Sequence, residues 1–293
     1  MRYDSGRAFR QALEHQLNLL FQERNIPLVR LRKQVAFERF LARLQHFQPD
    51  AWILKGGLAM QLRLGSQSRT TKDIDLLNYF RVDHLYETLV DVATRDMGDL
   101  FTFEVLQKDN EPGDELGGER YQIKCLLDGR LFETFHIDVG SKDVLIADVD
   151  HLPFEPILAF AGIQPVQIPC YPICNQIAEK FHALTRLYRS GESSRAKDFV
   201  DILLLAKVKD IPGTTLSLAI QITFKIRDTH PIPTQMPKLA VNMYREYGKL
   251  AKELALPYAD IQQAENALAA FLNPVLQYDD PGSWQPAEWK WKL

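Results

Sequence analysis

Apolar side chains recur at helical spacing in two parts of the chain, the first fifty residues and the last third. The first series runs from Phe9 to Leu20, and a second runs from Leu31 to Leu44 after Pro27. Residues three and four apart share one face of an α-helix, so these series predict two amphipathic N-terminal helices. The same spacing predicts C-terminal helices over about 174–189, 196–208, 214–227, 236–254 and 259–273.

Short runs between these two regions have the composition of β-strands. The strand candidates are residues 51–54, 101–106, 121–127 and 130–140. Asp128-Gly129 separates the last two runs and favours a two-residue hairpin, so we expect an antiparallel or mixed sheet. The acidic, glycine-rich segment 109–119 is expected to form a mobile loop.

A group of prolines between residues 153 and 172 marks an extended crossover, after which helical spacing returns. We therefore predict an α+β protein with two domains. Residues 1–160 would form N-terminal helices and a mixed-sheet core, and residues 161–293 would form a helical domain.

Composition narrows the class of protein. The chain has 293 residues, 46% of them hydrophobic, with 35 Lys+Arg against 38 Asp+Glu. A net charge of −3 excludes a polycation that binds nucleic acid indiscriminately. Three cysteines are too few for a disulfide framework, and no apolar run approaches the roughly 20 residues of a membrane span. We expect a soluble, cytoplasmic protein with no membrane association.

The sharpest chemical feature is Asp73-Ile74-Asp75. Alternate residues of a strand share a face, so both carboxylates would point one way and Ile74 into the core. Carboxylates this close repel each other unless a cation lies between them, and Mg²⁺ favours such ligands. Alone, the pattern also fits a surface turn or a strand edge.

Two neighbouring features strengthen the metal interpretation. Gly56-Gly57 lies between a strand and a helix, where backbone N–H groups can receive a phosphate, although a glycine pair is also an ordinary turn. Asp138 lies in the apolar strand 130–140, with His136 on the same side. A carboxylate there needs a partner, either a metal or backbone donors at a strand end.

The C-terminal part adds several weaker candidates. Lys180 lies beside an apolar helical stripe, from which it would reach either solvent or a cleft. Asp198 and Asp201 share a helix face three residues apart, where a capping role is the simplest alternative. Six positive side chains between residues 22 and 43 form either a solvated face or an RNA-facing patch.

Other features have simpler explanations. Cys170 and Cys174 lack a second pair at zinc spacing, and His182 is expected to be packed in a helix. The tail contains three tryptophans, for which we favour docking on the protein itself over a partner. These three are Trp284, Trp289 and Trp291.

Several blocks together resemble a known family. Gly56-Gly57 followed by Arg69-Thr70-Thr71-Lys72-Asp73-Ile74-Asp75-Leu76 is similar to the signature of AbiEii/AbiGii-type, MenT-like nucleotidyltransferase toxins of the DNA polymerase β superfamily. The similarity continues in Ala178-Glu179-Lys180, in Arg195-Ala196-Lys197-Asp198-Phe199-Val200-Asp201, and in Thr223-Phe224 with Arg227. This resemblance implies a polymerase-β-like mixed sheet with flanking helices, and a helical domain that completes the active-site cleft.

The resemblance also implies roles for individual residues. Catalysis would involve Asp73, Asp75, Asp138, Lys180 and Asp198, and the metal ligands would be Asp73, Asp75 and Asp138. Nucleotide binding would involve Gly56, Gly57, Arg69, Thr71, Lys180 and Arg195. Thr71 is also where related toxins carry a hydroxyl that becomes modified. The superfamily more often has Gly-Ser where this chain has Gly56-Gly57.

The function that the resemblance implies is nucleotidyl transfer from an NTP with Mg²⁺, or Mn²⁺ in its place. The acceptor would be the 3′ end of tRNA, and the chain would be the toxin of a type IV-like toxin-antitoxin or abortive-infection system used in antiviral defence. A cognate antitoxin protein would be its partner. The alternatives are nucleotidylation of a protein or small molecule, and a non-catalytic nucleotide-binding regulator.

Overall fold

The computed structural model describes residues 2–107, 118–186, 195–258, 260–278 and 280–293. The chain divides into two compact units. Unit 1 comprises Met1–Leu62, Thr70–Lys142 and Asp150–Cys170. Unit 2 comprises Arg63–Arg69, Asp143–Val149 and Tyr171–Leu293.

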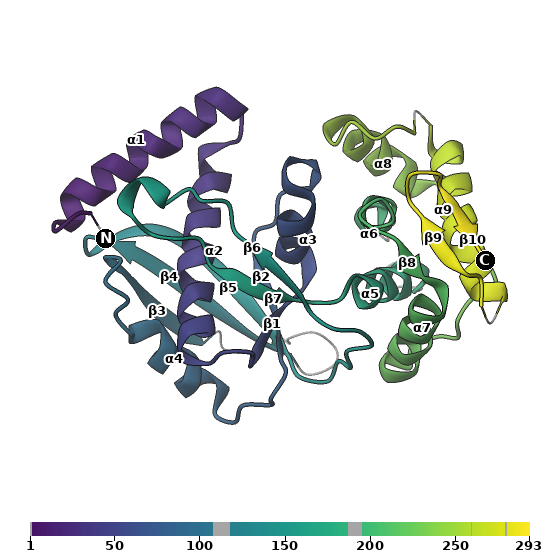
Figure 1. The fold of residues 1–293 in the computed structure, drawn as a ribbon, viewed down its shortest axis with the longest axis horizontal. Helices are drawn as coiled ribbons and strands as arrows, with labels where there is room; N and C mark the ends of the chain where they lie inside the picture. Colours follow the sequence, from purple (N-terminus) through teal and green to yellow (C-terminus); the bar gives the residue numbers. More distant parts are fainter. Residues whose placement is uncertain (1, 108–117, 187–194, 259, 279) are drawn as a thin grey trace. The chain divides into compact units, whose positions relative to one another are not determined.

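Unit 1 is a mixed sheet with helices packed on it (Figure 1). Its helices are α1 (Gly6–Arg24), α2 (Leu28–Phe47), α3 (Gly56–Leu64), whose last two residues belong to unit 2, and α4 (Leu85–Thr94). Its strands are β1 (Trp52–Leu54), β2 (Ile74–Asn78), β3 (Phe101–Gln107), β4 (Glu119–Leu127), β5 (Arg130–Gly140), β6 (Asp150–Pro153) and β7 (Gln167–Cys170). They lie in the order β3-β4-β5-β2-β1-β7-β6.

The pairing of these strands places the centre of the sheet. Strand β5 pairs antiparallel with β4 and parallel with β2, and β2 pairs antiparallel with β1. The predicted hairpin at Asp128-Gly129 is confirmed, because both residues have the positive φ, 57° and 65°, that a type I′ turn requires. The strand runs predicted at 51–54, 101–106, 121–127 and 130–140 are confirmed as β1, β3, β4 and β5.

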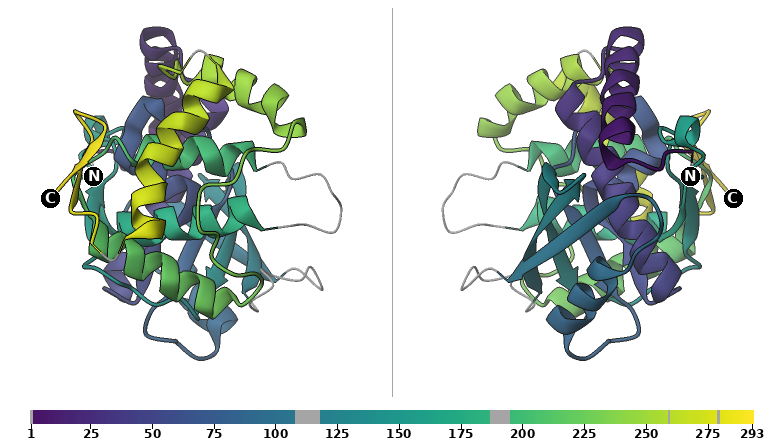
Figure 2. Two further views of the ribbon diagram at one scale, coloured as in Figure 1. Left: turned by 90° about the vertical axis from the view of Figure 1, so that its right-hand side faces the viewer. Right: turned by 90° about the vertical axis from the view of Figure 1, so that its left-hand side faces the viewer.

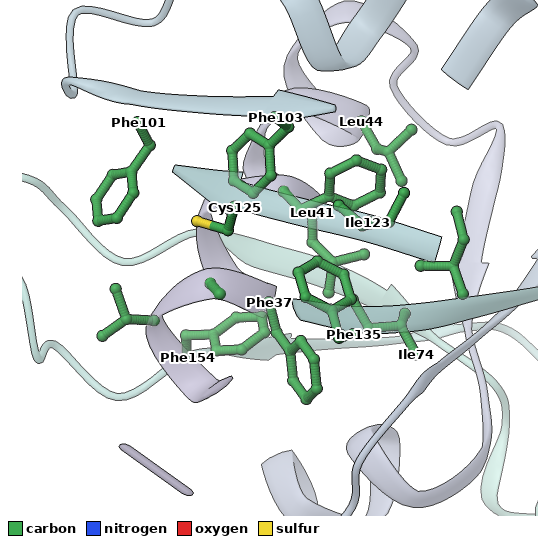
Figure 3. Close-up of a cluster of buried hydrophobic side chains, with 14 of the residues drawn as sticks. Phe37, Leu41, Leu44, Ile74, Phe101, Phe103, Ile123, Cys125, Phe135 and Phe154 are labelled. Atoms are coloured by element: carbon green, nitrogen blue, oxygen red, sulfur yellow. The ribbon is translucent and has the colours of Figure 1, made fainter. Parts of the chain in front are cut away.

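Helix α2 covers one face of the sheet and forms the core with it (Figure 3). The Phe37 ring packs edge-on to Phe135 with centroids 5.0 Å apart, and Phe40 lies 5.4 Å from Phe103. Helix α1 lies on the same face, where Phe9 contacts Phe101 (Figures 1 and 2). Burying each such ring contributes about 2–3 kcal/mol. Ile74 and Leu76 of β2, and Phe135, Ile137 and Val139 of β5, belong to this core, so the alternate residues of both strands lie on the other face.

The basic stretch between residues 22 and 43 is not a solvated or RNA-facing surface throughout, and the prediction is wrong for two of its six side chains. Arg39 and Arg43 are 4% and 0% exposed, and both pair with buried Asp99. The Nη1 and Nη2 atoms of Arg43 donate to the two carboxylate oxygens at 2.9 and 2.8 Å. Arg32 also has a partner, since its Nη2 lies 2.6 Å from Glu14.

Unit 2 is mainly helical, and Figure 2 shows its helices and C-terminal strands from two further sides. Its elements are α5 (Ile173–Thr185), α6 (Ala196–Leu205), β8 (Ile211–Pro212), α7 (Gly213–Arg227), α8 (Asn242–Glu253), α9 (Ile261–Gln277), β9 (Ser283–Gln285) and β10 (Lys290–Lys292). Asn175 fastens segment 143–149 to α5, because its side chain accepts from Ile146 N and donates to Val144 O.

The tryptophan-rich tail docks within unit 2, which confirms the prediction of self-docking. Trp284 is fully buried, and its Nε1 donates to the Ala206 carbonyl at 2.7 Å. Trp289 and Trp291 donate in the same way to carbonyls of α9 at 3.0 Å. The tail therefore packs as a β9–β10 hairpin, antiparallel to β8.

Several boundaries differ from the sequence prediction. The proline-rich crossover contains two strands, β6 and β7, that extend the sheet. Helix α8 begins at Asn242 rather than near residue 236, after Pro237. Helix α9 continues past Pro274 to Gln277. Residues 109–117 of the predicted mobile loop lie outside the described residues, as do residues 187–189 of the predicted helix 174–189. The two-domain division at residue 160 stays a prediction.

The cysteines and the hydropathy of the helices were also considered in the sequence prediction. Cys125, Cys170 and Cys174 are buried, and none of them forms a disulfide. Across the described residues, no helix is both long enough and apolar enough to cross a bilayer.

Candidate functional site

Gly56 follows strand β1 and begins helix α3, and it lies directly against the side chain of Asp75. A Cβ atom built on Gly56 would lie 1.8 Å from Asp75 Oδ2, and the backbone there has a φ of +59°. Both facts exclude any residue with a side chain. The Lys55 amide donates to the Asp75 carbonyl at 2.8 Å, which fixes this close approach.

Gly57 meets Thr71 in the same way. A Cβ on Gly57 would lie 2.7 Å from Thr71 Oγ1, so the Thr71 hydroxyl fills the space that a side chain would need. This hydroxyl donates to the Asp73 carbonyl at 3.2 Å. The departure from Gly-Ser therefore has a local cause, because a serine at 57 would displace Thr71.

The carboxylates line the face of the sheet opposite the core. Asp75 on β2 and Asp138 on the parallel strand β5 are register partners, while their neighbours Ile74 and Ile137 are fully buried. Asp75 and Asp138 therefore project side by side from adjacent strands, as the alternation of β5 predicted.

Asp73 lies at the start of the same row of side chains, just before β2. Its Oδ1 atom is 3.5 Å from Nδ1 of His136, which precedes Asp138 by two residues on β5. The face thus presents three carboxylates and one imidazole within two neighbouring rungs of the sheet.

Asp138 has an arginine partner that the sequence prediction missed. Arg120 lies opposite Asp138 in the β4–β5 ladder, and its Nε and Nη2 atoms donate to Oδ1 and Oδ2, both at 2.6 Å. Paired donors at this distance form a bidentate, charge-assisted contact. Both oxygens of the third predicted metal ligand are therefore engaged by a cation from the chain itself.

The donor chemistry of this face fits a divalent ion. Asp73, Asp75 and Asp138 offer carboxylate oxygens, which Mg²⁺ and Mn²⁺ prefer as ligands. Gly56, which lies against Asp75, has no side chain to fill the space beside that carboxylate. As the side chains lie, no three His, Cys, Asp or Glu groups of the described chain converge as a metal cluster. Asp138 would have to exchange Arg120 for the ion.

Unit 2 contains a second charged cluster, centred on Asp201 of α6. Asp201 is fully buried, and its Oδ2 accepts from Lys180 Nζ at 2.6 Å. Arg69 donates to the same carboxylate from its Nε and Nη2 atoms at 3.0–3.2 Å. Asp201 thereby links Lys180 of α5 to the segment before Thr70.

The charges in this cluster are mutually stabilised. Burial alone would raise the pKa of Asp201, but Lys180 and Arg69 hold it below its usual value. Burial would likewise lower the pKa of Lys180, but Asp201 and then Asp198 hold it above its usual value. Both residues therefore stay ionised despite their burial.

Asp198 forms the outer part of this cluster. Its Oδ1 lies 3.4 Å from Lys180 Nζ, and its Oδ2 accepts from Arg195 Nη1 at 3.1 Å. Its side chain is 14% exposed, whereas that of Asp201 is 0% exposed. Lys180 thus lies between a buried carboxylate and a more accessible one.

The blocks that include Glu179 and Thr223–Arg227 have a structural role in unit 2. Arg227 Nη2 lies 2.8 Å from both carboxylate oxygens of Glu179, the residue before Lys180. Phe224 packs 5.8 Å from Phe181 on the same pair of helices. These contacts fasten α7 to α5 and so hold the backbone that carries Lys180.

The predicted site residues therefore form two groups. Unit 1 brings together Gly56, Gly57, Thr71, Asp73, Asp75 and Asp138. In unit 2, Asp201 joins Arg69 to Lys180, and Asp198 joins Lys180 to Arg195. The sequence prediction gave no site role to Asp201 or Arg120. For Asp201 a signal was present, because it shares a helix face with Asp198.

Comparisons with known proteins identify a family and a fold. The profile described as "Nucleotidyl transferase AbiEii toxin, Type IV TA system" matches residues 39–292. The structure is similar to MenT4, a nucleotidyltransferase toxin from Mycobacterium tuberculosis H37Rv, with 16% identity, a TM-score of 0.55, and coverage of 89% of this chain and 99% of that one.

Two further solved structures show weaker similarity. JHP933 from Helicobacter pylori has 16% identity and a TM-score of 0.47, over 83% of this chain and 93% of that chain. An antigenic nucleotidyltransferase-like protein from Paracoccidioides brasiliensis has 18% identity and a TM-score of 0.44, over 78% and 93%. Curated proteins give no match.

The chain shares its fold, a mixed sheet with flanking helices, with the nucleotidyltransferase toxin MenT4. Because the profile match covers most of the sequence, the chain belongs to the AbiEii nucleotidyltransferase toxin family of type IV toxin-antitoxin systems. It is therefore a nucleotidyltransferase, and its family implies an NTP substrate and an antitoxin partner. The predicted fold class and family are confirmed.

Proposed function

We propose that this toxin transfers a nucleoside monophosphate from an NTP to the 3′ end of tRNA and releases pyrophosphate. A 3′ end modified in this way cannot be aminoacylated, so the transfer would arrest growth. The reaction would take place in the cytoplasm, where NTPs and tRNA are found, as an abortive response to infection. The observation that carries the proposal is the side-by-side placement of Asp75 and Asp138 against a glycine-started helix.

Asp73, Asp75 and Asp138 would hold the divalent ion, for which Mg²⁺ is the natural choice and Mn²⁺ a substitute. The ion would offset charge on the reacting phosphate. Gly56 and Gly57 support this proposal because they bring the N-terminal backbone of α3 to Asp75 with no side chain between. The backbone N–H groups and the positive end of a helix dipole favour phosphate at a helix start.

Asp138 is also the candidate general base for the acceptor hydroxyl, since it shares the face with Asp75. Both of its oxygens accept hydrogen bonds from Arg120, which would have to release the carboxylate before it takes a proton. Thr71 would border the phosphate site through its hydroxyl, which lies beside Gly57.

In unit 2, Lys180 would bind the triphosphate, with Arg69 and Arg195 as further cationic groups and Asp198 as an active-site carboxylate. The raised pKa of Lys180, which burial opposes and Asp201 maintains, supports a permanently charged ammonium group. Asp201 is then a positioning residue, because it contacts Lys180 and Arg69 from a fully buried position.

The test is incubation of the purified protein with each labelled NTP, Mg²⁺ and total RNA. We expect one NTP to label a band of tRNA size, and Asp75→Ala to abolish labelling. Thr102→Ala is the matched control, since Thr102 lies on β3 away from the carboxylate rungs. Label in protein or a small molecule instead of tRNA would contradict the proposed acceptor. Activity that survives Asp75→Ala would contradict the proposed metal site.

A further inference from the structure

Arg120 holds Asp138 in a contact that a divalent ion would have to replace. Both oxygens of Asp138 accept hydrogen bonds from Arg120 at 2.6 Å, one from Nε and one from Nη2. When both oxygens of a carboxylate accept such hydrogen bonds, the lone pairs that would bind a metal are already occupied. We propose that Arg120 is a built-in competitor of the metal, which keeps Asp138 out of the ligand set until metal and nucleotide displace it.

The ladder geometry supports this assignment because it places the three groups in one row. Arg120 on β4 pairs with Asp138 on β5, and Asp138 pairs with Asp75 on β2. The guanidinium therefore lies one strand beyond the carboxylate pair, on the same face of the sheet. In this position its charge offsets the repulsion between Asp138 and Asp75 when no cation is bound.

The pair is exposed enough to exchange. The side chains of Arg120 and Asp138 are 35% and 32% exposed, in contrast to the fully buried Arg43 of the Asp99 cluster. A water-exposed ion pair is easier to separate than a buried one, so a divalent ion that gains several carboxylate ligands can replace it. Once released, the guanidinium is a planar, permanently charged donor suited to a polyphosphate.

The direction of the effect separates this role from a structural one. If Arg120 competes with the ion, its removal strengthens metal binding, because both oxygens of Asp138 become available and one positive charge is lost. A residue that only supports the sheet or orients Asp138 as a ligand would weaken metal binding when removed. Removing one positive charge a few ångströms from a divalent ion changes its affinity by roughly tenfold even at the dielectric constant of water.

The inference rests on the proposed function, since it assumes that Asp73, Asp75 and Asp138 bind a metal. The experiment measures Mn²⁺ binding to the full chain by calorimetry, and free Mn²⁺ by electron paramagnetic resonance, in about 0.1 M salt so that only nearby charges matter. The variants are Arg120→Gln, Arg120→Met and Arg120→Lys, with Lys124→Gln as the matched control. Lys124 lies on the same face of β4, two rungs away, and pairs with Glu104.

We expect Arg120→Gln and Arg120→Met to lower the Kd for Mn²⁺ roughly tenfold, and Arg120→Lys to lower it less. Lys124→Gln should leave it unchanged. In the double variant Arg120→Gln/Asp138→Asn the gain should disappear, because the carboxylate that Arg120 releases is no longer present. A larger rise in melting temperature on adding Mn²⁺ to Arg120→Gln than to the wild type provides a second reading.

Two results would overturn the inference. An unchanged or weaker affinity in both Arg120→Gln and Arg120→Met, while the wild type binds Mn²⁺ and Asp75→Asn does not, would reject Arg120 as a competitor and leave the metal site standing. No Mn²⁺ binding by the wild type or by any Arg120 variant would reject the metal site together with the inference.

Discussion

The Asp75 carboxylate lies in the space where a side chain on Gly56 would begin, 1.8 Å from an ideal Cβ position. This relationship explains why the strand-to-helix turn begins with glycine independently of any ligand. The backbone at this turn has a positive φ, and the Asp75 carboxylate occupies the position that a Cβ atom would take. Glycine is the residue that fits both conditions.

Gly56→Ala should therefore impair both folding and activity. Left-handed backbone in a non-glycine residue costs about 1 kcal/mol, and the collision with Asp75 adds to this, so we expect a total loss of roughly 2–4 kcal/mol in the free energy of unfolding. Urea denaturation measures the loss, and labelled-NTP transfer should fall below detection because Asp75 is displaced.

Gly98→Ala is the control that separates the two causes. Gly98 has a similar φ of +64°, but nothing lies within 4 Å of its Cβ position. This substitution should cost only the backbone strain, about 1 kcal/mol. Equal losses for Gly56→Ala and Gly98→Ala would mean that the contact with Asp75 does not matter.

Asp201→Asn should be the most damaging substitution in unit 2. It leaves Lys180 and Arg69 without the buried charge that compensates them, and breaking such a pair costs about 3–5 kcal/mol. The pKa of Lys180 should fall, because burial then acts with only Asp198 to oppose it. Urea denaturation at pH 7 and at pH 9 measures both effects. We expect the larger loss of stability at pH 7, because a buried lysine with a lowered pKa destabilises the folded chain most where the unfolded chain keeps its proton.

Asp198→Asn is the matched control for Asp201→Asn. Asp198 lies farther from Lys180 Nζ, 3.4 Å against 2.6 Å, and is partly exposed. We expect it to cost no more than about 1 kcal/mol in stability but to reduce transfer strongly. If Asp198→Asn destabilised the protein as much as Asp201→Asn, the division into a buried positioning carboxylate and an accessible catalytic one would be wrong.

Glu38 should make unit 1 less stable as pH rises. Burial raises the pKa of Glu38 from 4.5 to about 7, against an opposing effect of Arg39. Between these values the folded chain holds a proton that the unfolded chain has lost, so stability declines from pH 4.5 to pH 7. The decline is on the order of 3 kcal/mol. Glu38→Gln should remove it in urea titrations, whereas Glu155→Gln, at an exposed pair with Arg24, should not.

His182 should have the opposite effect in unit 2. Burial, with help from His230 and Arg227, lowers the pKa of His182 to about 4. Between about pH 4 and 6.5 the unfolded chain binds the proton and the folded chain does not, so stability rises with pH. His182→Gln should flatten that rise. The Nε2 atom of His182 lies 2.8 Å from Thr229 Oγ1, a contact that an amide can retain. A rise that persists in His182→Gln would assign it to another group.

Much of the fold could be predicted because it depends on local patterns. The alternation of β5 placed Phe135 and Ile137 in the core and Asp138 on the other face, and burial confirms this. Turn chemistry placed the Asp128-Gly129 hairpin correctly. These features depend on strand periodicity and on the φ that each turn residue tolerates, and both can be read from sequence.

The partner of Asp138 could not be predicted, because the ladder contains an irregularity. Counting back from the hairpin, where Leu127 pairs with Arg130, places Arg120 opposite Ile137. A register shift between Cys125 and Leu126 moves Arg120 by one residue, opposite Asp138. A one-residue slip exchanges the two faces of a strand, so the functional pairing depends on a β-bulge that the sequence does not announce.

Charge pairs between residues far apart in the sequence could not be predicted either. Arg39 and Arg43 look like part of a basic helix surface, and only the fold shows that Asp99 lies against them. Sequence separation hides such a partner, because burial of a charge is decided by tertiary packing and not by helix periodicity.

Asp99→Asn therefore provides a direct test of whether these arginines serve the fold. The substitution leaves two buried guanidinium groups without a carboxylate, so we expect a loss of about 3–5 kcal/mol in the free energy of unfolding. Burial would raise the pKa of Asp99, but Arg43 and Arg39 hold it below its usual value, so the wild type should lose this stabilisation only as pH falls below about 4. The control is Asp91→Asn, which removes an exposed pair with Arg95 and should cost less than about 0.5 kcal/mol. If Asp99→Asn were as mild as Asp91→Asn, the buried charge cluster would not be what stabilises the contact between α2 and the sheet.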